Sequence, residues 1–207
     1  MKLYYSNTSP YSRKVRLVIF EKCLDAQVEE VVVNPFEDNP ELNAANPLGK
    51  IPVLLFDDDE TLFDSPVICR YLDGLSNQHP LIPQEDKQQW LTMRWEALAD
   101  GMTDAVYNLV MERRRPASEQ SPTWIGRWAA EIQRVLQHMD QRVSELDGDI
   151  SLAQLAVAAS IGYLDLRIPE LLYETQCPQV AEYPRLLEWY EKIATRPSMM
   201  ATRPGDR

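Results

Sequence analysis

The sequence predicts an α/β domain with a small mixed sheet, followed by an all-helical domain. Three observations carry this prediction. Strand-like apolar runs alternate with helical spacing only in residues 1–78. Residues 79–86 have the composition of a linker, and residues 87–207 repeat apolar side chains at spacings of three and four. The length of 207 residues suits two small domains.

The first domain is expected to run strand, helix, strand, loop, strand, strand, helix. The expected ranges are 3–5, 11–24, 28–33, the turn-rich loop 34–49, 53–56, 61–63 and 65–75. The acidic residues 57–60 lie between two short apolar runs, which is typical of a hairpin tip. A strand–helix–strand start predicts two parallel strands, and the hairpin adds an antiparallel pair.

The second domain contains four clear helical patterns. They cover residues 87–115, residues 123–146, a segment that starts at Ser151 and a segment that starts at Pro184. The third pattern is rich in alanine, which predicts a helix packed on all sides. Ser151 and Gln154 have the spacing of a capping box at its start.

Composition excludes several classes of function. A net charge of −11 disfavours binding to nucleic acid, and no apolar run is long enough to cross a membrane. The N-terminus lacks the apolar region of a secretory signal. Three cysteines and two histidines at scattered positions argue against a disulfide framework and against a metal site. We therefore expect a cytoplasmic protein without a metal, in which Cys69 is a buried apolar thiol and Cys23 and Cys177 are incidental.

The segment between the first strand and the first helix reads Thr8-Ser9-Pro10-Tyr11-Ser12. Free N–H groups and the helix dipole favour an anion at such a position. The same residues also fit a simple N-cap serine followed by a helix-starting proline. The segment alone leaves both interpretations open.

Two further segments point to a peptide-like ligand. Ile51-Pro52 precedes a strand, and a cis peptide bond there would leave the Ile51 backbone available to pair with an extended peptide. Asp64 and Ser65 stand at another helix N-terminus, where they can hold the ammonium and the carboxylate of an amino acid. A plain helix cap is the alternative for this pair.

In this order and spacing, the three segments resemble the N-terminal, thioredoxin-like domain of cytosolic glutathione transferases. The resemblance covers the whole chain and is greatest to bacterial members related to the serine-using theta and zeta classes. Ser9-Pro10-Tyr11-Ser12 is also similar to the Cys-Pro-Tyr-Cys site of glutaredoxins, with oxygen in place of both sulfurs. The resemblance implies glutathione as co-substrate, a small electrophile as second substrate, and a homodimer.

The resemblance also implies roles for individual residues. Ser9 matches the catalytic serine, whose hydroxyl donates to the glutathione sulfur. Ile51, before Pro52, matches the backbone that pairs with the cysteinyl unit. Asp64 and Ser65 match the pair that holds the γ-glutamyl end. A further match is Lys50, at a position that often reaches the glycine carboxylate.

The electrophile pocket has no sequence motif. We expect its lining to include Tyr11, Tyr107, Val110, Met111 and Arg114. The run of arginines at 113–115 complements the dipole at the end of a long helix, and one of the three is a candidate contact for an acidic second substrate.

Two functions of different classes fit the sequence. The first is an enzyme that joins glutathione to an electrophile or uses glutathione to reduce peroxides. The second is a non-catalytic binding or regulatory module on the same fold. The intact set of Ser9, Ile51-Pro52, Asp64 and Ser65 favours the enzyme.

Overall fold

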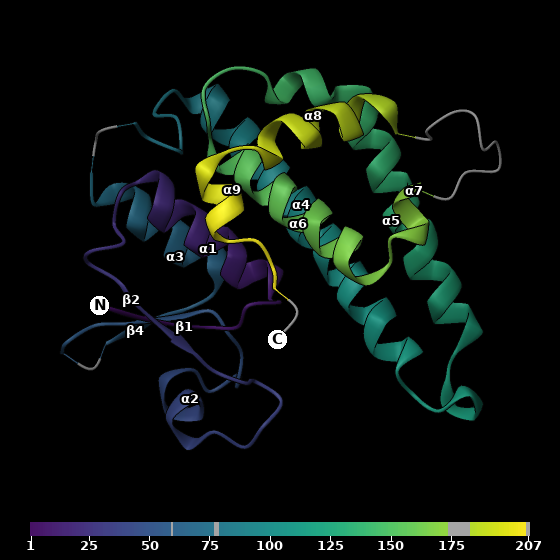
Figure 1. Cartoon of the computed structure of the whole chain (residues 1–207), viewed down its shortest axis with the longest axis horizontal. Helices are drawn as coiled ribbons and strands as arrows, with labels where there is room; N and C mark the ends of the chain where they lie inside the picture. Colours follow the sequence, from purple (N-terminus) through teal and green to yellow (C-terminus); the bar gives the residue numbers. More distant parts are fainter. Residues whose placement is uncertain (59, 77–78, 174–182, 206–207) are drawn as a thin grey trace.

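The computed structural model describes residues 1–58, 60–76, 79–173 and 183–205, so Cys177 lies outside the described residues. A four-stranded mixed sheet with its helices forms the N-terminal part, and helices alone form the rest (Figure 1). The predicted α/β domain followed by an all-helical domain is therefore confirmed.

The strands stand in the order β2-β1-β3-β4. Strand β1 pairs in parallel with β2 and antiparallel with β3, and β3 pairs antiparallel with β4, as expected from the strand–helix–strand start and the hairpin. The elements of this part are β1 (Lys2–Tyr5), α1 (Pro10–Glu21), β2 (Glu29–Val32), α2 (Pro40–Ala45), β3 (Val53–Leu55), β4 (Thr61–Leu62) and α3 (Ser65–Gly74).

Alternating side chains give the sheet two covered faces. Leu3 and Leu54 pack with α1 and α3 on one face, and Val53 packs with Leu42 of α2 on the other. Figure 1 shows α2 on the opposite side of the sheet from α1 and α3. The neighbouring strands β1 and β3 thus lie between helices, whereas the edge strand β2 is largely exposed.

The expected loop 34–49 was wrong in one respect, because it contains helix α2. Asn39 caps this helix by accepting a hydrogen bond from the Leu42 N–H at 2.9 Å, and Pro40 occupies its first turn. An asparagine followed by proline is a helix start as well as a turn signal. The short length of α2 hides its periodicity in the sequence.

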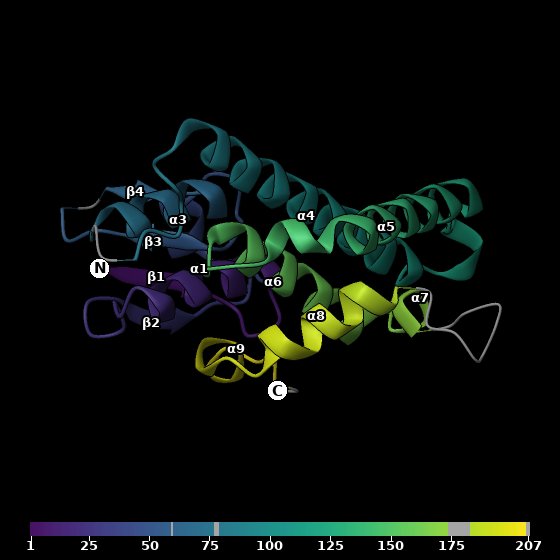
Figure 2. The same cartoon turned by 90° about the horizontal axis from the view of Figure 1, so that it is seen from above.

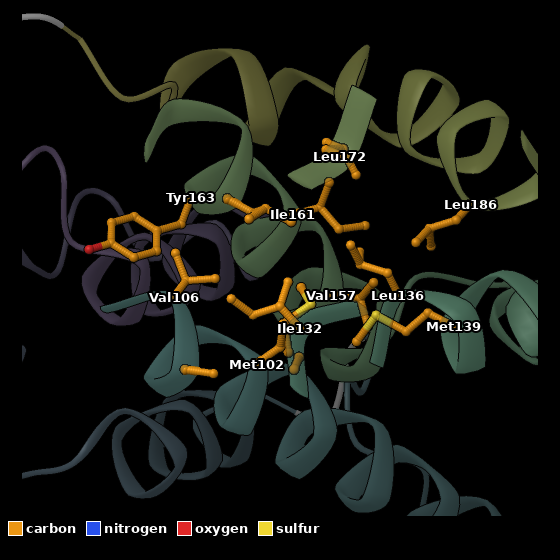
Figure 3. Packing of buried hydrophobic residues seen from close by; sticks show 14 of the residues in the cluster. Met102, Val106, Ile132, Leu136, Met139, Val157, Ile161, Tyr163, Leu172 and Leu186 are labelled. Carbon is orange, nitrogen blue, oxygen red and sulfur yellow. The ribbon is translucent and has the colours of Figure 1, made fainter. Parts of the chain in front are cut away.

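The helical part is built around α6. Its residues 152–164 are all buried, as the alanine-rich pattern predicts. Figure 2 shows α6 between α4 and α5 on one side and α8 on the other, and Figure 3 shows the apolar side chains that fill the space between them. The elements are α4 (Asp86–Arg113), η1 (Ala117–Glu119), α5 (Pro122–Arg142), η2 (Val143–Leu146), α6 (Leu152–Arg167), α7 (Glu170–Tyr173), α8 (Pro184–Ala194) and α9 (Pro197–Ala201).

The start of α6 carries the predicted capping box. Gln154 Oε1 accepts a hydrogen bond from the Ser151 N–H, and Gln154 Nε2 donates to the Leu146 carbonyl at 2.7 Å. Gln154 therefore fixes both the start of α6 and the end of η2.

Buried ion pairs join α1 to the helices that follow it. Lys14 of α1 is 1% exposed, and its Nζ lies 3.0 Å from Glu96 Oε1 and 2.6 Å from Asp100 Oδ2, both on α4. Lys22 Nζ lies 2.9 Å from Asp73 Oδ1 on α3. Because Ser9 is the N-cap of α1, the contacts of Lys14 hold the segment that carries Ser9 in a fixed position against α4.

Gly162 marks a close approach of α6 to α1. A β-carbon at this position would overlap the Arg13 guanidinium and lie 2.9 Å from the Tyr190 hydroxyl. We expect Gly162→Ala to lower the free energy of unfolding by about 1–3 kcal/mol, because the buried Arg13 and the half-buried Tyr190 side chains must shift. Gly126→Ala in α5 is the matched control, since nothing lies within 4 Å of its added β-carbon. There we expect a gain of about 0.5–1 kcal/mol. Urea denaturation of both variants checks this; a gain in Gly162→Ala would show that Arg13 yields freely.

Candidate active site

The sheet register brings the three predicted segments to one end of the sheet. Strand β1 leads to Ser9, and its Tyr4 pairs with Val53, the residue directly after Ile51-Pro52. In the hairpin, Leu54 pairs with Leu62, so the chain that leaves β4 passes the start of β3 before it reaches Asp64. Residues far apart in the sequence thus converge where β1 ends and β3 begins.

Ser9 is the N-cap of α1. Its Oγ accepts a hydrogen bond from the Ser12 N–H at 3.2 Å, and its carbonyl accepts from the Arg13 N–H at 2.9 Å. A serine hydroxyl has one proton and two lone pairs, so capping uses a lone pair and leaves the proton available. The N-cap and the anion-site interpretations are therefore compatible.

Neither neighbouring hydroxyl replaces Ser9 as a donor in this arrangement. The Tyr11 hydroxyl donates its proton to Asp104 on α4. Burial raises the pKa of Tyr11, and Asp104 raises it further, so the phenol stays protonated at neutral pH. Ser12 is fully buried, and its Oγ has no hydrogen-bond partner in the described part of the chain.

The Ile51–Pro52 peptide bond is cis, as the sequence led us to expect. Pro52 is buried directly before β3, and Ile51 is half-buried. Among the described residues, no backbone hydrogen bond uses the Ile51 N–H or carbonyl outside the regular elements. The Ile51 backbone therefore offers one donor and one acceptor at the sheet end.

Asp64 and Ser65 open helix α3. The Asp64 carboxylate is exposed and makes no capping hydrogen bond, while Ser65 is 2% exposed. The plain helix-cap interpretation thus does not account for the Asp64 side chain. The carboxylate stays available for a cation, and the first N–H groups of α3 stay available for an anion.

Lys50 is exposed next to this corner. Its carbonyl accepts a hydrogen bond from Asn46 Nδ2 at 2.8 Å. In the described ranges, no carboxylate lies within ion-pair distance of its ammonium group. The turn before it needs Gly49, whose φ of 61° lies in the left-handed region that favours glycine.

Of the five expected electrophile-pocket residues, Tyr11 lies on α1, three lie on α4, and Arg114 is the C-cap of α4. Tyr107, Met111 and Arg114 follow Asp104 at spacings of three and four, so they share one face of α4. The hydrogen bond from Tyr11 to Asp104 brings this face to the first turn of α1. Val110 departs from the group, since it is only 9% exposed and packs in the apolar cluster of the helical part.

Sequence reasoning missed Asp104, Tyr163 and Arg167 as members of this region. Tyr163 on α6 lies at the edge of the apolar cluster, with its hydroxyl directed toward the purple ribbon of α1 (Figure 3). The Arg167 guanidinium carbon lies 5.7 Å from the Tyr163 ring centroid. The spacing of Asp104 from Tyr107 was a signal for the first; the other two depend on tertiary packing.

Known protein families share this fold and this arrangement of segments. The family model described as "Glutathione S-transferase, N-terminal domain" matches residues 8–75, and the one described as "Glutathione S-transferase, C-terminal domain" matches residues 122–192. The chain belongs to the glutathione S-transferase family. The transferase is 31% identical to the uncharacterized GST-like protein YibF of Escherichia coli, with 99% of this chain and 98% of that protein covered.

Solved structures agree with the assignment. A glutathione S-transferase from Methylobacillus flagellatus with glutathione bound is 42% identical to this transferase, with a TM-score of 0.88 and 99% of both chains covered. A glutathione transferase family member from Pseudomonas fluorescens with bound glutathione is 35% identical, with a TM-score of 0.91 and 99% of both chains covered. The resemblance read from the sequence is thereby confirmed, and the protein is a glutathione S-transferase.

Within the described ranges, the structure contains no group of three or more histidine, cysteine, aspartate or glutamate side chains that could hold a metal ion. None of the described helices combines the length and the apolar character that a membrane span requires.

Proposed function

We propose that this transferase joins the glutathione thiolate to a small electrophile, with the Ser9 hydroxyl as hydrogen-bond donor to the sulfur. The observation that carries the proposal is the geometry of Ser9. Its Oγ accepts the Ser12 N–H at 3.2 Å, which leaves the hydroxyl proton for a ligand at the N-terminus of α1. In the reaction, the sulfur lone pair forms a carbon–sulfur bond and the leaving group departs with its bonding pair. The same thiolate would serve in peroxide reduction.

The required effect on the thiol is modest. A free thiol has a pKa of about 8.5, and the thiolate is the nucleophile. Lowering this pKa by about two corresponds to about 2.7 kcal/mol. One hydrogen bond to a charged group together with a helix N-terminus supplies a stabilisation of this size. Ser9 itself stays protonated and is neither base nor nucleophile.

The remaining corner residues would hold the tripeptide. We assign the Ile51 backbone to the cysteinyl unit, Asp64 to the γ-glutamyl ammonium, and Ser65 with the α3 N-terminus to the γ-glutamyl carboxylate. The exposed Lys50 ammonium would reach the glycine carboxylate. We propose residues 1–78 as the glutathione-binding domain, residues 79–86 as linker and residues 87–207 as the domain that supplies the electrophile pocket.

The pair at the start of α3 can be tested directly. Asp64→Asn and Ser65→Ala should each weaken glutathione binding by about 10- to 100-fold, because each removes a hydrogen bond to a charged group worth about 1.5–3 kcal/mol. Isothermal titration with glutathione measures the change. Asp57→Asn is the matched control, since it removes the same charge from the 99% exposed hairpin tip. Unchanged affinity in both α3 variants would place the γ-glutamyl end elsewhere.

We also propose a homodimer in the cytoplasm. Val67, Tyr71 and Leu75 are 45%, 37% and 41% exposed, and their spacing of four places them on one face in and directly after α3. An apolar face of this kind favours a symmetric partner. Light scattering at tens of micromolar should give twice the chain mass of 23.9 kDa. A mass of one chain at that concentration would exclude the dimer.

A further inference from the structure

The three consecutive arginines at the end of α4 have different environments. Arg113 Nη1 lies 2.5 Å from Glu170 Oε1, and Arg115 Nη2 lies 3.1 Å from Glu119 Oε2. No carboxylate in the described part of the chain lies within ion-pair distance of Arg114. Arg114 is the C-cap residue of α4 and uses its backbone N–H for this, whereas the carbonyls of Arg113 and Arg115 accept hydrogen bonds from Gln120 Nε2 and not from the Arg114 side chain. The Arg114 side chain is therefore a cation with no assigned structural role.

A second such cation lies opposite, on α6. Arg167 is half-buried, and its Nε is buried without a hydrogen-bond partner among the described residues. Its guanidinium lies over the Tyr163 ring, one helical turn earlier. The Arg113–Glu170 pair ties the end of α4 to the start of α7, just after α6 ends, so the chain segments that carry Arg114 and Arg167 lie side by side.

The electrostatics at Tyr163 support this placement. Burial raises the pKa of the Tyr163 phenol, whereas the positive charges of Arg167 and Arg114 oppose that rise. Both arginines thus lie close enough to the Tyr163 hydroxyl to oppose the rise of its pKa. Tyr163 in turn contributes to the raised pKa of Tyr11, which follows Ser9 by two residues. The Tyr163 hydroxyl is directed toward α1 (Figure 3), the helix that Ser9 caps.

The acidic groups that the structure describes beside these arginines are engaged by other partners. Asp104 accepts the Tyr11 hydroxyl, Glu170 pairs with Arg113, and Asp165 acts on Tyr173 and Tyr190. The protein carries a net charge of −11, whereas this region holds the exposed Arg114 and the half-buried Arg167 without an ion-pair partner in the described part of the chain. Guanidinium groups match carboxylates in shape and charge.

We propose that the electrophile of this transferase carries a carboxylate, which Arg114 and Arg167 bind while Tyr107 and Met111 contact the body of the molecule. The proposal rests on the transferase function given above. Asp104 and Arg114 are ten residues apart on α4, which is about 15 Å along the helix. Since Tyr11 bonds to Asp104 at the near end, the carboxylate lies away from the reacting carbon, and an aromatic ring with a para carboxylate is a suitable rigid spacer for the test.

Binding of two matched analogues tests this without turnover. The first is S-(4-carboxybenzyl)glutathione, and the second is its neutral carboxamide. We expect the carboxylate to bind the wild type about tenfold more tightly, and we expect this preference to vanish in the Arg114→Gln/Arg167→Gln variant. The matched control Arg115→Gln removes the next arginine of the run and should keep the tenfold preference. Unmodified glutathione should bind all three proteins equally, which shows that the variants are folded.

Equal binding of the two analogues to the wild type would overturn the proposal, as would a preference that survives the double substitution. A second experiment measures turnover of 4-chloro-3,5-dinitrobenzoate and of its carboxamide, in which chloride is released as the carbon–sulfur bond forms. It distinguishes failure of the carboxylate subsite from failure of the transferase function. Selective binding without turnover of either compound would retain the anion subsite and contradict the transferase function. Equal turnover and equal binding would retain the transferase function and remove the subsite.

Discussion

Replacing Lys14 by methionine is expected to lower the free energy of unfolding by about 3–5 kcal/mol, because it leaves buried carboxylates without their cation. Lys14 Nζ lies 3.0 Å from Glu96 Oε1 and 2.6 Å from Asp100 Oδ2, and the exposed fractions of the three side chains are 1%, 4% and 25%. Burial acts to lower the pKa of Lys14, but Asp100 and Glu96 outweigh it, so the ammonium stays charged. Urea denaturation measures the loss.

The matched control is Lys2→Met. Lys2 pairs with Glu29 at 3.8 Å, and both side chains are more than half exposed, so its loss should change stability by no more than about 1 kcal/mol. Losses of equal size in the two variants would show that burial of the Lys14 cluster has no energetic consequence.

The Lys14 variant should also respond to pH. Burial raises the pKa of Asp100, and Lys14 opposes that rise. Without Lys14, native Asp100 binds a proton at a pH where the unfolded chain has lost it, so the stability of the variant falls as pH rises. We therefore expect a smaller deficit relative to wild type near about pH 5 than at neutral pH.

Ser9→Ala is expected to reduce conjugation at neutral pH by about 10- to 100-fold. The substitution removes the donor to sulfur, worth about 1.5–3 kcal/mol, and leaves the N-terminus of α1 in place. Raising the pH should restore part of the rate, since free thiolate then forms without help. The measurement is kcat/KM against pH with one electrophile. If Ser9→Ala has the same kcat/KM as wild type at every pH, Ser9 serves only as a helix cap.

Loss of the cap itself needs a separate control, because Ser9 Oγ also accepts the Ser12 N–H. Ser121 caps α5 in the same way, through the Trp124 N–H at 3.4 Å. Ser121→Ala should cost about 1 kcal/mol of stability, as Ser9→Ala should through its cap, and leave conjugation unchanged. Ser9→Thr keeps the hydroxyl and should keep most of the activity.

Local chemistry made much of the fold readable from the sequence. Several signals determine structure only within a few residues along the chain. They are the proline at the start of α1 and of α3, the β-branched residues of the strands, and the acidic hairpin tip. A cis Ile51–Pro52 bond was considered because a proline directly precedes a strand, and the structure has it. The buried α6 was expected from its alanine content, since small side chains permit close packing on all sides.

The features that escaped the sequence depend on distant residues. Lys14 forms ion pairs with Glu96 and Asp100, which lie more than 80 positions later in the sequence. No periodic pattern of apolar residues predicts that a lysine is only 1% exposed. The partner of Tyr11 is Asp104, 93 positions away. The separate environments of Arg113, Arg114 and Arg115 likewise become visible only when α7 and the η1 turn are in place.

The thiol pKa of bound glutathione tests the central claim most directly. Ultraviolet absorbance of the thiolate, recorded against pH for the complex, gives this pKa without any electrophile. Wild type should show a pKa about two below the free value of about 8.5, and Ser9→Ala should return most of the difference. A bound thiol that titrates like free glutathione in the wild type, or with the same lowered pKa in both proteins, would contradict the assignment of Ser9 as the group that stabilises the thiolate.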